Sequence, residues 1–123
     1  MIKIYHYSNK DFRKYIKPDY FGENHYSHNS EQLSNIKRSY FYLNKNNIEI
    51  HLKGCKFCYI AEVDKKELYD IDLDYRNFKQ TSLTADDFIR KVKNNDYEGI
   101  YNNNQVVLFY STKIKNKKTL KKR

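Results

Sequence analysis

Apolar and polar residues alternate with a period of two along much of the chain, which is the pattern of half-buried β-strands. The first such stretch, residues 2–7, places His6 near its end on one face and Tyr7 on the other. Residues 38–43 and 57–63 are rich in aromatic and β-branched side chains, as buried strands are. We therefore expect strands over these three ranges and over two weaker ones, 48–52 and 68–74.

Other stretches show the period of an α-helix. Phe12 and Ile16 share a helix face at i, i+4 spacing, which predicts a short helix over residues 9–16. Thr84 precedes a stronger pattern, because its side chain can cap a helix whose first turn is acidic. A brief helix is also expected over residues 31–34.

Near the C-terminus, two apolar stretches flank three asparagines. Asparagine tolerates left-handed backbone angles, so residues 102–104 are expected to form the turn of a β-hairpin between 97–101 and 105–110. The order of elements predicts an α+β fold with mixed or antiparallel sheets and a few short helices. A chain of 123 residues has room for one domain, which we expect over residues 1–114.

The basic charge of the chain is concentrated at its end. Seven of the 24 lysines and arginines lie in residues 113–123, where there is no acid, so residues 1–112 carry 17 basic and 15 acidic residues. Residues 115–123 are therefore expected to form a basic, flexible tail. Such a tail predicts non-specific contact with nucleic-acid phosphates.

Composition excludes several classes of protein. No apolar run approaches the roughly 18 residues that span a bilayer, and the first residues lack the apolar core of a signal peptide. Cys55 and Cys58 are the only cysteines and lie too close in sequence to join distant elements, which excludes a disulfide scaffold. A cytoplasmic protein without membrane contact is expected. Its 13 tyrosines and seven phenylalanines predict an aromatic core and a tyrosine-lined pocket.

Three short motifs carry the candidate chemistry. In chain order they are Tyr5-His6-Tyr7-Ser8, Gly22 with Tyr26-Ser27, and Tyr97-Glu98-Gly99-Ile100. Their order resembles that of the ADP-ribosyltransferase fold, in which a first strand ends in His-x-Ser/Thr and a Tyr-Asp-Gly-Ile segment precedes an apolar strand. The resemblance spans residues 1–114 and implies a protein that binds NAD between the first strand and the loop at 22–27.

By this resemblance, His6 and Ser8 contact the nicotinamide ribose, and Tyr26 stacks on the nicotinamide ring. Arg38 and Tyr40, on the strand after the loop, are expected to flank the same cleft and contact phosphate. The NAD-binding residues are then His6, Tyr7, Ser8, Gly22, Tyr26, Ser27, Arg38 and Tyr40.

Cleavage of the glycosidic bond of NAD needs a carboxylate, because positive charge develops on the ribose in the transition state. The resemblance implies an acid from the last motif, but the nearest position falls in residues 102–105, which offer only amides. Two interpretations are open: Glu98 is the acid, or Gln105 is a neutral hydrogen-bond donor in a protein that binds NAD without cleaving it. The catalytic candidates are thus His6, Glu98 and Gln105. An active form would transfer ADP-ribose to a protein or nucleic-acid acceptor.

Two other functions are considered. His25-x-x-His28 and Cys55-x-x-Cys58 supply four ligands that zinc prefers, although their order is not that of zinc fingers, and two buried thiols explain the cysteines as well. The alternative to an NAD site is a small non-catalytic module that contacts nucleic acid or a nucleoprotein through the basic tail. The size and charge also fit a mobile-element effector that acts on a host protein or nucleoprotein.

Overall fold

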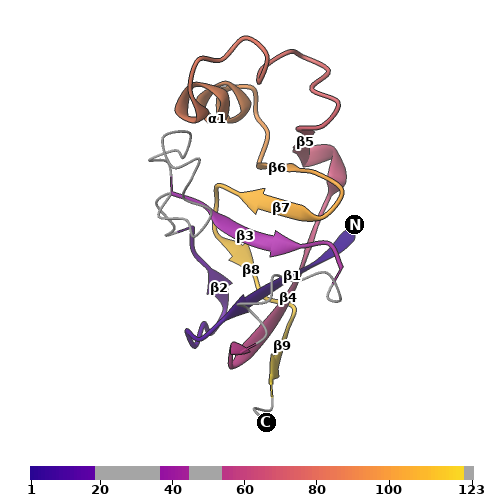
Figure 1. The fold of residues 1–123 in the computed structure, drawn as a ribbon. Coiled ribbons are helices and arrows are strands. Elements are labelled where there is room, and N and C mark those ends of the chain that lie inside the picture. Colours follow the sequence, from indigo (N-terminus) through magenta and orange to yellow (C-terminus); the bar gives the residue numbers. More distant parts are fainter. Residues whose placement is uncertain (19–36, 45–53, 121–123) are drawn as a thin grey trace.

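The computed structural model describes residues 1–18, 37–44 and 54–120. Its strands are Ile2–Ser8 (β1), Tyr15–Ile16 (β2), Ser39–Tyr42 (β3), Phe57–Val63 (β4), Leu68–Asp70 (β5), Gly99–Tyr101 (β6), Gln105–Leu108 (β7), Thr112–Lys113 (β8) and Asn116–Thr119 (β9). The helices are a 3-10 turn at Lys65–Glu67 (η3) and Ala85–Asn94 (α1). Seven strands form one sheet in the order β5-β6-β7-β3-β1-β4-β9, and β2 pairs with β8 (Figure 1). Because β5 and β6 pair parallel while the other neighbours pair antiparallel, the expected α+β class with a mixed sheet is confirmed.

Helix α1 packs on one face of the sheet, near the end formed by β5, β6 and β7. The Thr84 side chain accepts a hydrogen bond from the Asp87 backbone N–H at 3.1 Å, as its capping role predicts. Phe88 and Val92 are buried in a cluster with Val107 of β7. The predicted helix is therefore confirmed, and its apolar stripe explains its position.

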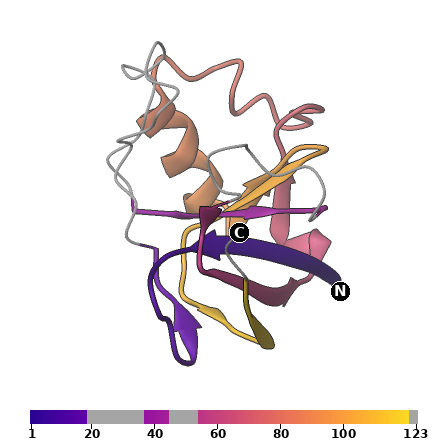
Figure 2. The same cartoon turned by 60° about the horizontal axis from the view of Figure 1, so that its bottom comes forward.

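A second cluster lies on the opposite face of the sheet. Ile4, Phe41 and Tyr59, from β1, β3 and β4, are fully buried there. The small β2–β8 sheet covers this face, and Ile16 of β2 is also fully buried (Figure 2). The two clusters place the main sheet between α1 and the β2–β8 layer, and cross-strand alternation assigns each strand residue to one side.

Strand β1 pairs unequally with its two neighbours. It pairs with β4 along its whole length, from Ile2 opposite Val63 to Ser8 opposite Phe57. Its register with β3 is the single pair Tyr5–Tyr42. The two strands thus separate beyond this pair, at the end of β1 that carries the first motif.

The helix expected over residues 9–16 is wrong. This segment bends back as an extended chain, and its last two residues form β2 with β8. The Tyr59 hydroxyl donates to the Lys10 carbonyl at 2.6 Å and accepts from the Phe12 N–H at 2.8 Å. These bonds come from a residue 47–49 positions away, so they override the local helical spacing of Phe12 and Ile16.

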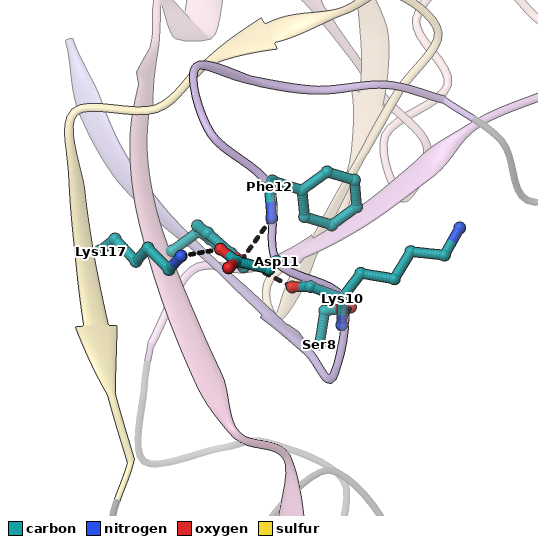
Figure 3. A network of polar contacts seen from close by, with 6 residues as sticks. Ser8, Lys10, Asp11, Phe12 and Lys117 are labelled. Carbon is teal, nitrogen blue, oxygen red and sulfur yellow. Dashed lines mark hydrogen bonds and ion pairs between the residues drawn. The ribbon is translucent and has the colours of Figure 1, made fainter.

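The flexible tail from residue 115 is also corrected for the residues described. Asn116–Thr119 form β9, which pairs with β4 from Phe57–Thr119 to Ile60–Asn116. The Lys117 ammonium lies 4.4 Å from the centre of the Phe57 ring and forms an ion pair with Asp11 (Figure 3). Backbone pairing and a cation–π contact therefore integrate the basic segment into the sheet.

Of the other predicted elements, some are confirmed and some lie outside the described residues. Strands at 2–7, 38–43 and 57–63 and the hairpin around residues 102–104 are confirmed, and β5 covers the start of the expected 68–74 strand. The helix at 31–34 and the strand at 48–52 lie outside the described residues. In the part of the chain that is described, no helix is long and apolar enough to cross a membrane.

Candidate functional site

The helix-side face of the sheet carries a run of tyrosines on neighbouring strands. Tyr42 of β3 pairs with Tyr5 of β1 on one side and with Gln105 of β7 on the other. Tyr40 packs against the α1 cluster, so its side chain is on the helix side of the sheet. Tyr42, two residues further along β3, is on the same side, and so are the residues paired directly with it. We call this surface the tyrosine face; its members are Tyr5, Tyr7, Arg38, Tyr40, Tyr42, Cys58 and Gln105.

Arg38 lies beneath this surface, with only 2% of its area exposed. Its Nε donates to the Tyr40 hydroxyl at 2.7 Å, and its guanidinium carbon lies 5.7 Å from the centre of the same ring. A guanidinium with several N–H donors in a fixed plane is suited to phosphate and carboxylate groups. Arg38 and Tyr40 thus contact each other directly, and their expected contact with phosphate stays a prediction.

Tyr7 and Tyr42 meet across the gap between β1 and β3. Their ring centres are 6.3 Å apart in an edge-to-face arrangement. Burial raises the pKa of the Tyr7 hydroxyl far above its usual value, and the neighbouring Cys58 thiol adds to the rise. The Tyr7 side chain therefore stays neutral over the whole physiological range and offers an O–H group.

Gln105 begins β7 and is half-buried on the tyrosine face. Its backbone N–H donates to the Asn102 Oδ1 at 2.7 Å, and its carbonyl accepts from the Asn102 N–H at 3.0 Å. These two bonds close the hairpin turn and hold the Gln105 backbone in place. Gln105 is thereby held opposite Tyr42, on the same face of the sheet.

His6 lies at the seam between β1 and β3, not on the tyrosine face. Its ring packs 5.2 Å from Phe41 and 5.8 Å from Phe12, in the cluster opposite α1. Its Nδ1 lies 2.6 Å from the Tyr40 carbonyl oxygen, which can only accept, so Nδ1 carries the proton. The histidine therefore bridges the two strands where their backbone pairing stops.

Ser8 is occupied by the turn that follows β1. Its hydroxyl oxygen accepts a hydrogen bond from the Lys10 N–H at 3.0 Å (Figure 3). The same turn is held by the Tyr59 hydroxyl and by the ion pair between Asp11 and Lys117. This geometry gives Ser8 a structural role at the position where the family resemblance implies a ribose contact.

Glu98 is not brought to the tyrosine face beside β1. It is exposed at the start of β6, which is separated from β1 by β7 and β3. Three strand spacings amount to about 14 Å. Its backbone N–H donates to the Glu67 carbonyl at 2.8 Å, which places Glu98 beside η3 and β5.

Several candidates lie outside the described residues: Gly22, Tyr26, Ser27, His25 and His28. Both cysteines are described, and both are buried and form no disulfide. Burial raises the pKa of the Cys55 thiol, which favours its neutral form. Within the described ranges, no three His, Cys, Asp or Glu side chains gather as a metal site.

Sequence reasoning did not include Tyr42 in the candidate NAD site, and it considered Cys58 only as a zinc ligand. Tyr42 lies two residues after Tyr40, so alternation along β3 gave the signal that both rings share a face. Cys58 joins the set because it pairs with Tyr7 across β1 and β4. That register depends on strand pairing over some 50 residues of sequence, which has no local signal.

Comparison of this chain with protein-family models, curated proteins and solved structures gives no match. Its function is therefore argued from the residues and their geometry.

Proposed function

We propose that this chain is an ADP-ribosyltransferase-like domain that binds NAD on the tyrosine face and holds it without cleaving it. The observation that carries the proposal is the convergence of Tyr7, Arg38 with Tyr40, and Gln105 on one face of three neighbouring strands. Tyr7, Arg38, Tyr40 and Gln105 are all candidates that the sequence motifs and their spacing indicate.

The groups on this face suit the parts of a dinucleotide. The half-buried Tyr7 and Tyr40 rings offer apolar surfaces for a planar base, and their hydroxyls bond to ribose or amide groups. The Arg38 guanidinium is buried beneath the Tyr40 ring, and its positive charge there favours an anionic group such as the pyrophosphate above it. The Gln105 amide both donates and accepts hydrogen bonds, as the carboxamide of nicotinamide requires of a partner.

The chemistry of this set favours binding over cleavage. An oxocarbenium-like transition state is stabilised by a nearby carboxylate. The members of the tyrosine face supply phenols, an amide, a thiol and a guanidinium. Glu62 lies on the same side of the sheet but pairs with Lys3 near the start of β1, away from Tyr7. The candidate acid Glu98 lies about three strands from β1. Gln105 is therefore proposed as a neutral hydrogen-bonding partner of the ligand.

His6 acts in this proposal as a positioning residue. Its Nδ1–H bond to the Tyr40 carbonyl and its contacts with Phe12 and Phe41 fix β3 against β1. Replacing it with alanine is expected to lower the thermal midpoint as well as NAD affinity. A ribose contact by its other ring nitrogen stays a prediction from the family resemblance.

Titration calorimetry with NAD tests the proposal, with one variant at Gln105 and one at the candidate acid Glu98. Gln105→Ala removes one side chain of the tyrosine face but leaves the backbone bonds to Asn102. Loss of one hydrogen bond of about 1 kcal/mol predicts an affinity roughly five- to tenfold weaker. Glu98→Gln, the matched control, is expected to bind NAD like the unmodified chain.

These measurements distinguish NAD binding without cleavage from no binding and from cleavage. Absence of heat with NAD at millimolar concentration contradicts the proposal, as does equal binding by the Gln105→Ala variant. Release of nicotinamide by the unmodified chain, abolished by Glu98→Gln, would show that Glu98 is the acid and that the protein is a transferase or hydrolase.

In the alternative function, nucleic acid would bind to the edge strand β9, because residues 116–119 form this strand and not a flexible tail. Lys118 of β9 and Lys115, just before it, are exposed and can offer charge to phosphates. Deleting residues 115–123 would remove β9, so Lys115→Gln with Lys118→Gln is the better variant. Oligonucleotide binding that falls steeply with salt and is lost in this variant would favour the alternative.

A further inference from the structure

The small β2–β8 sheet has one side toward the core and the other toward solvent. Ile16 of β2 is fully buried opposite Thr112 of β8. Tyr15 pairs with Lys113, and both of these residues are exposed. Successive residues of a strand point to opposite sides, so Tyr15 and Lys113 are neighbours on the outer side.

The segments that form this layer are strongly basic. Residues 10–18 and 110–120 together carry eight lysines and arginines and one acid, a net charge of +7 in a chain of +9. That acid, Asp11, forms an ion pair with Lys117 of β9 (Figure 3). The hydrogen bond from Lys117 lowers the pKa of the Asp11 carboxyl, and the charge of Arg13 adds to this effect. Positive charge is therefore in large excess in these two segments.

Exposed cationic side chains surround the Tyr15 ring. Arg13 and Lys14 precede it in the chain and Lys17 follows it, and all three are exposed. Lys113 is its partner on the neighbouring strand. We call this surface the basic layer; its members are Arg13, Lys14, Tyr15, Lys17 and Lys113.

The basic layer does not extend to the start of the β7–β8 connection. The Glu98 carbonyl accepts a hydrogen bond from the Phe109 N–H at 3.0 Å, so an exposed acid lies at that end. Lys113 is four residues further along the chain. The excess of positive charge is thus a property of the surface around β2 and β8.

Contacts with the core hold the basic layer in one arrangement. Ile16 is buried in the cluster opposite α1, and Ile114 packs against the same cluster. The Ile114 N–H donates to the Lys14 carbonyl at 2.9 Å. The Tyr59 hydroxyl accepts from the Phe12 N–H at 2.8 Å. The backbone around Tyr15 is therefore preformed, which lowers the entropy cost of binding a ligand there.

The groups of the basic layer favour single-stranded nucleic acid as the ligand. Lysine and arginine side chains neutralise phosphates whatever the sequence. The Tyr15 ring, which is 49% exposed among these charges, offers a surface on which a base can stack. Stacking on a side chain needs the face of an unstacked base, and a duplex hides those faces. A duplex therefore uses the charges of the layer and not the ring.

From these observations we infer that the basic layer binds single-stranded nucleic acid, with one base stacked on Tyr15 and the neighbouring phosphates held by the four cationic side chains. The inference does not rest on NAD binding, because the tyrosine face is on the α1 side of the main sheet and the β2–β8 layer covers the other side (Figure 2). It also differs from the β9 alternative, which needs phosphate contacts alone.

Fluorescence anisotropy with a labelled single strand of about 12 nucleotides tests the role of the ring on nuclease-treated protein. Tyr15→Leu removes the ring but keeps an apolar side chain, and it is expected to weaken binding at least about fivefold. Tyr15→Phe keeps the ring and is expected to bind like the unmodified chain. Tyr75→Leu, at a 78% exposed tyrosine after β5, is the matched control and is expected to change nothing.

A duplex of the same length separates stacking from charge. Its affinity is expected to be the same for Tyr15→Leu as for the unmodified chain, because no base face is available to the ring. A Tyr15→Leu variant that weakens single-strand and duplex binding equally would show that the ring does not stack on a base.

The salt dependence of single-strand binding tests the charges. Each phosphate neutralised on a single strand contributes about −0.7 to the slope of log affinity against log salt, so four contacts predict a slope of about −2.8. Lys14→Gln with Lys17→Gln is expected to reduce this slope to about −1.4. Lys66→Gln with Lys79→Gln replaces two exposed lysines elsewhere and is expected to leave it unchanged.

Several results would overturn the inference. One is an unmodified chain that does not bind the single strand at millimolar concentration and 0.05 M salt. Another is normal binding by Tyr15→Leu together with loss of binding in Lys115→Gln with Lys118→Gln, which would favour the β9 alternative. Displacement of the single strand by polyglutamate at equal charge concentration would indicate an acidic protein as the partner.

The thermal midpoint shows whether each variant keeps the fold. The replaced side chains are exposed, so the midpoint of the unmodified chain is expected throughout. If Tyr15→Leu lowers it, the salt slope of the Lys14→Gln with Lys17→Gln variant decides, and an unchanged slope then overturns the inference. Absence of NAD binding in calorimetry has no bearing on these measurements.

Discussion

Tyr7 of the tyrosine face combines a ring contact with a hydroxyl group whose pKa is shifted. Its ring contacts Tyr42, and burial with the Cys58 thiol nearby raises the pKa of its hydroxyl. A phenol whose pKa is raised by folding stabilises the protein at pH values below its unfolded pKa of about 10. That stabilisation is lost as the pH rises above this value, because the unfolded chain then releases the proton and the folded chain does not.

The Tyr7→Phe variant tests this linkage. Its thermal midpoint is expected to fall less steeply between pH 9 and 11 than that of the unmodified chain, because the group that titrates on unfolding is gone. Tyr75→Phe, at a 78% exposed position, is the matched control and is expected to keep the original slope. Equal slopes for all three proteins would show that Tyr7 titrates normally.

The side-chain amide of Gln105 is proposed to bind NAD at the position where cleavage of NAD would need a carboxylate. Changing its amide to a carboxylate with Gln105→Glu supplies the negative charge that a ribosyl oxocarbenium ion needs. We expect this variant to release nicotinamide from NAD slowly, above the rate of the unmodified chain and of Glu98→Gln. Chromatography of the reaction measures the product. A variant that binds NAD but forms no nicotinamide would show that the Gln105 side chain does not reach the ribose.

At the scale of elements, the last motif has a structural explanation. A Cβ on Gly99 would lie 2.1 Å from the Val107 carbonyl oxygen, so the β6–β7 pairing leaves no room for a side chain. The glycine of Tyr97-Glu98-Gly99-Ile100 is thus explained by strand packing, which needs no ligand. The motif is therefore weaker support for an NAD site than the convergence of side chains on the tyrosine face.

The Gly99→Ala variant is expected to be strongly destabilised. Overpacking against backbone costs about 1–3 kcal/mol or more, because a carbonyl in a strand ladder cannot move aside. Gly54→Ala is the control, since nothing lies within 4 Å of the equivalent Cβ there. Chemical denaturation measures both. Similar unfolding free energies for the two variants would contradict the close approach of β6 and β7.

The sequence pattern correctly predicted the elements that are determined by residues close to one another in the chain. Strand β1, helix α1 with its Thr84 cap and the hairpin at residues 102–104 follow from alternation, capping and turn residues within a few positions. The predictions of a helix over residues 9–16 and of a flexible tail from residue 115 were wrong. The partners of these segments, Tyr59 and the rest of β4, lie some 50 to 60 residues away in sequence. Long-range pairing of this kind has no signature in a short window.

The candidate site was predictable to a similar extent. Alternation predicts the strands that carry Tyr7 and Tyr40, and Arg38 contacts Tyr40, but a ligand site shared by these residues stays a prediction. The distance of Glu98 from β1 depends on the order of four strands, which the sequence did not provide. The orientation of His6 toward Phe12 and Phe41 depends on that packing as well.

At the scale of the whole molecule, the net charge of +9 is unevenly distributed along the chain. Residues 113–120, at the β9 edge of the sheet, carry four lysines and no acid. The tyrosine face has Arg38 as its one charged member, and Lys3 and Glu62 on the same side of the sheet pair with each other. NAD binding is therefore expected to depend little on the charge of the β9 edge.

The central claim is that NAD binds on the tyrosine face, and an NMR titration of the ¹⁵N-labelled chain tests it most directly. With NAD added to millimolar concentration, the account predicts that amide shifts concentrate at Tyr7, at residues 38–42 and at Gln105. Residues 70–80 and Glu98 are expected to keep their shifts. A spectrum that does not change, or shifts confined to β9 and residues 70–80, would contradict the account.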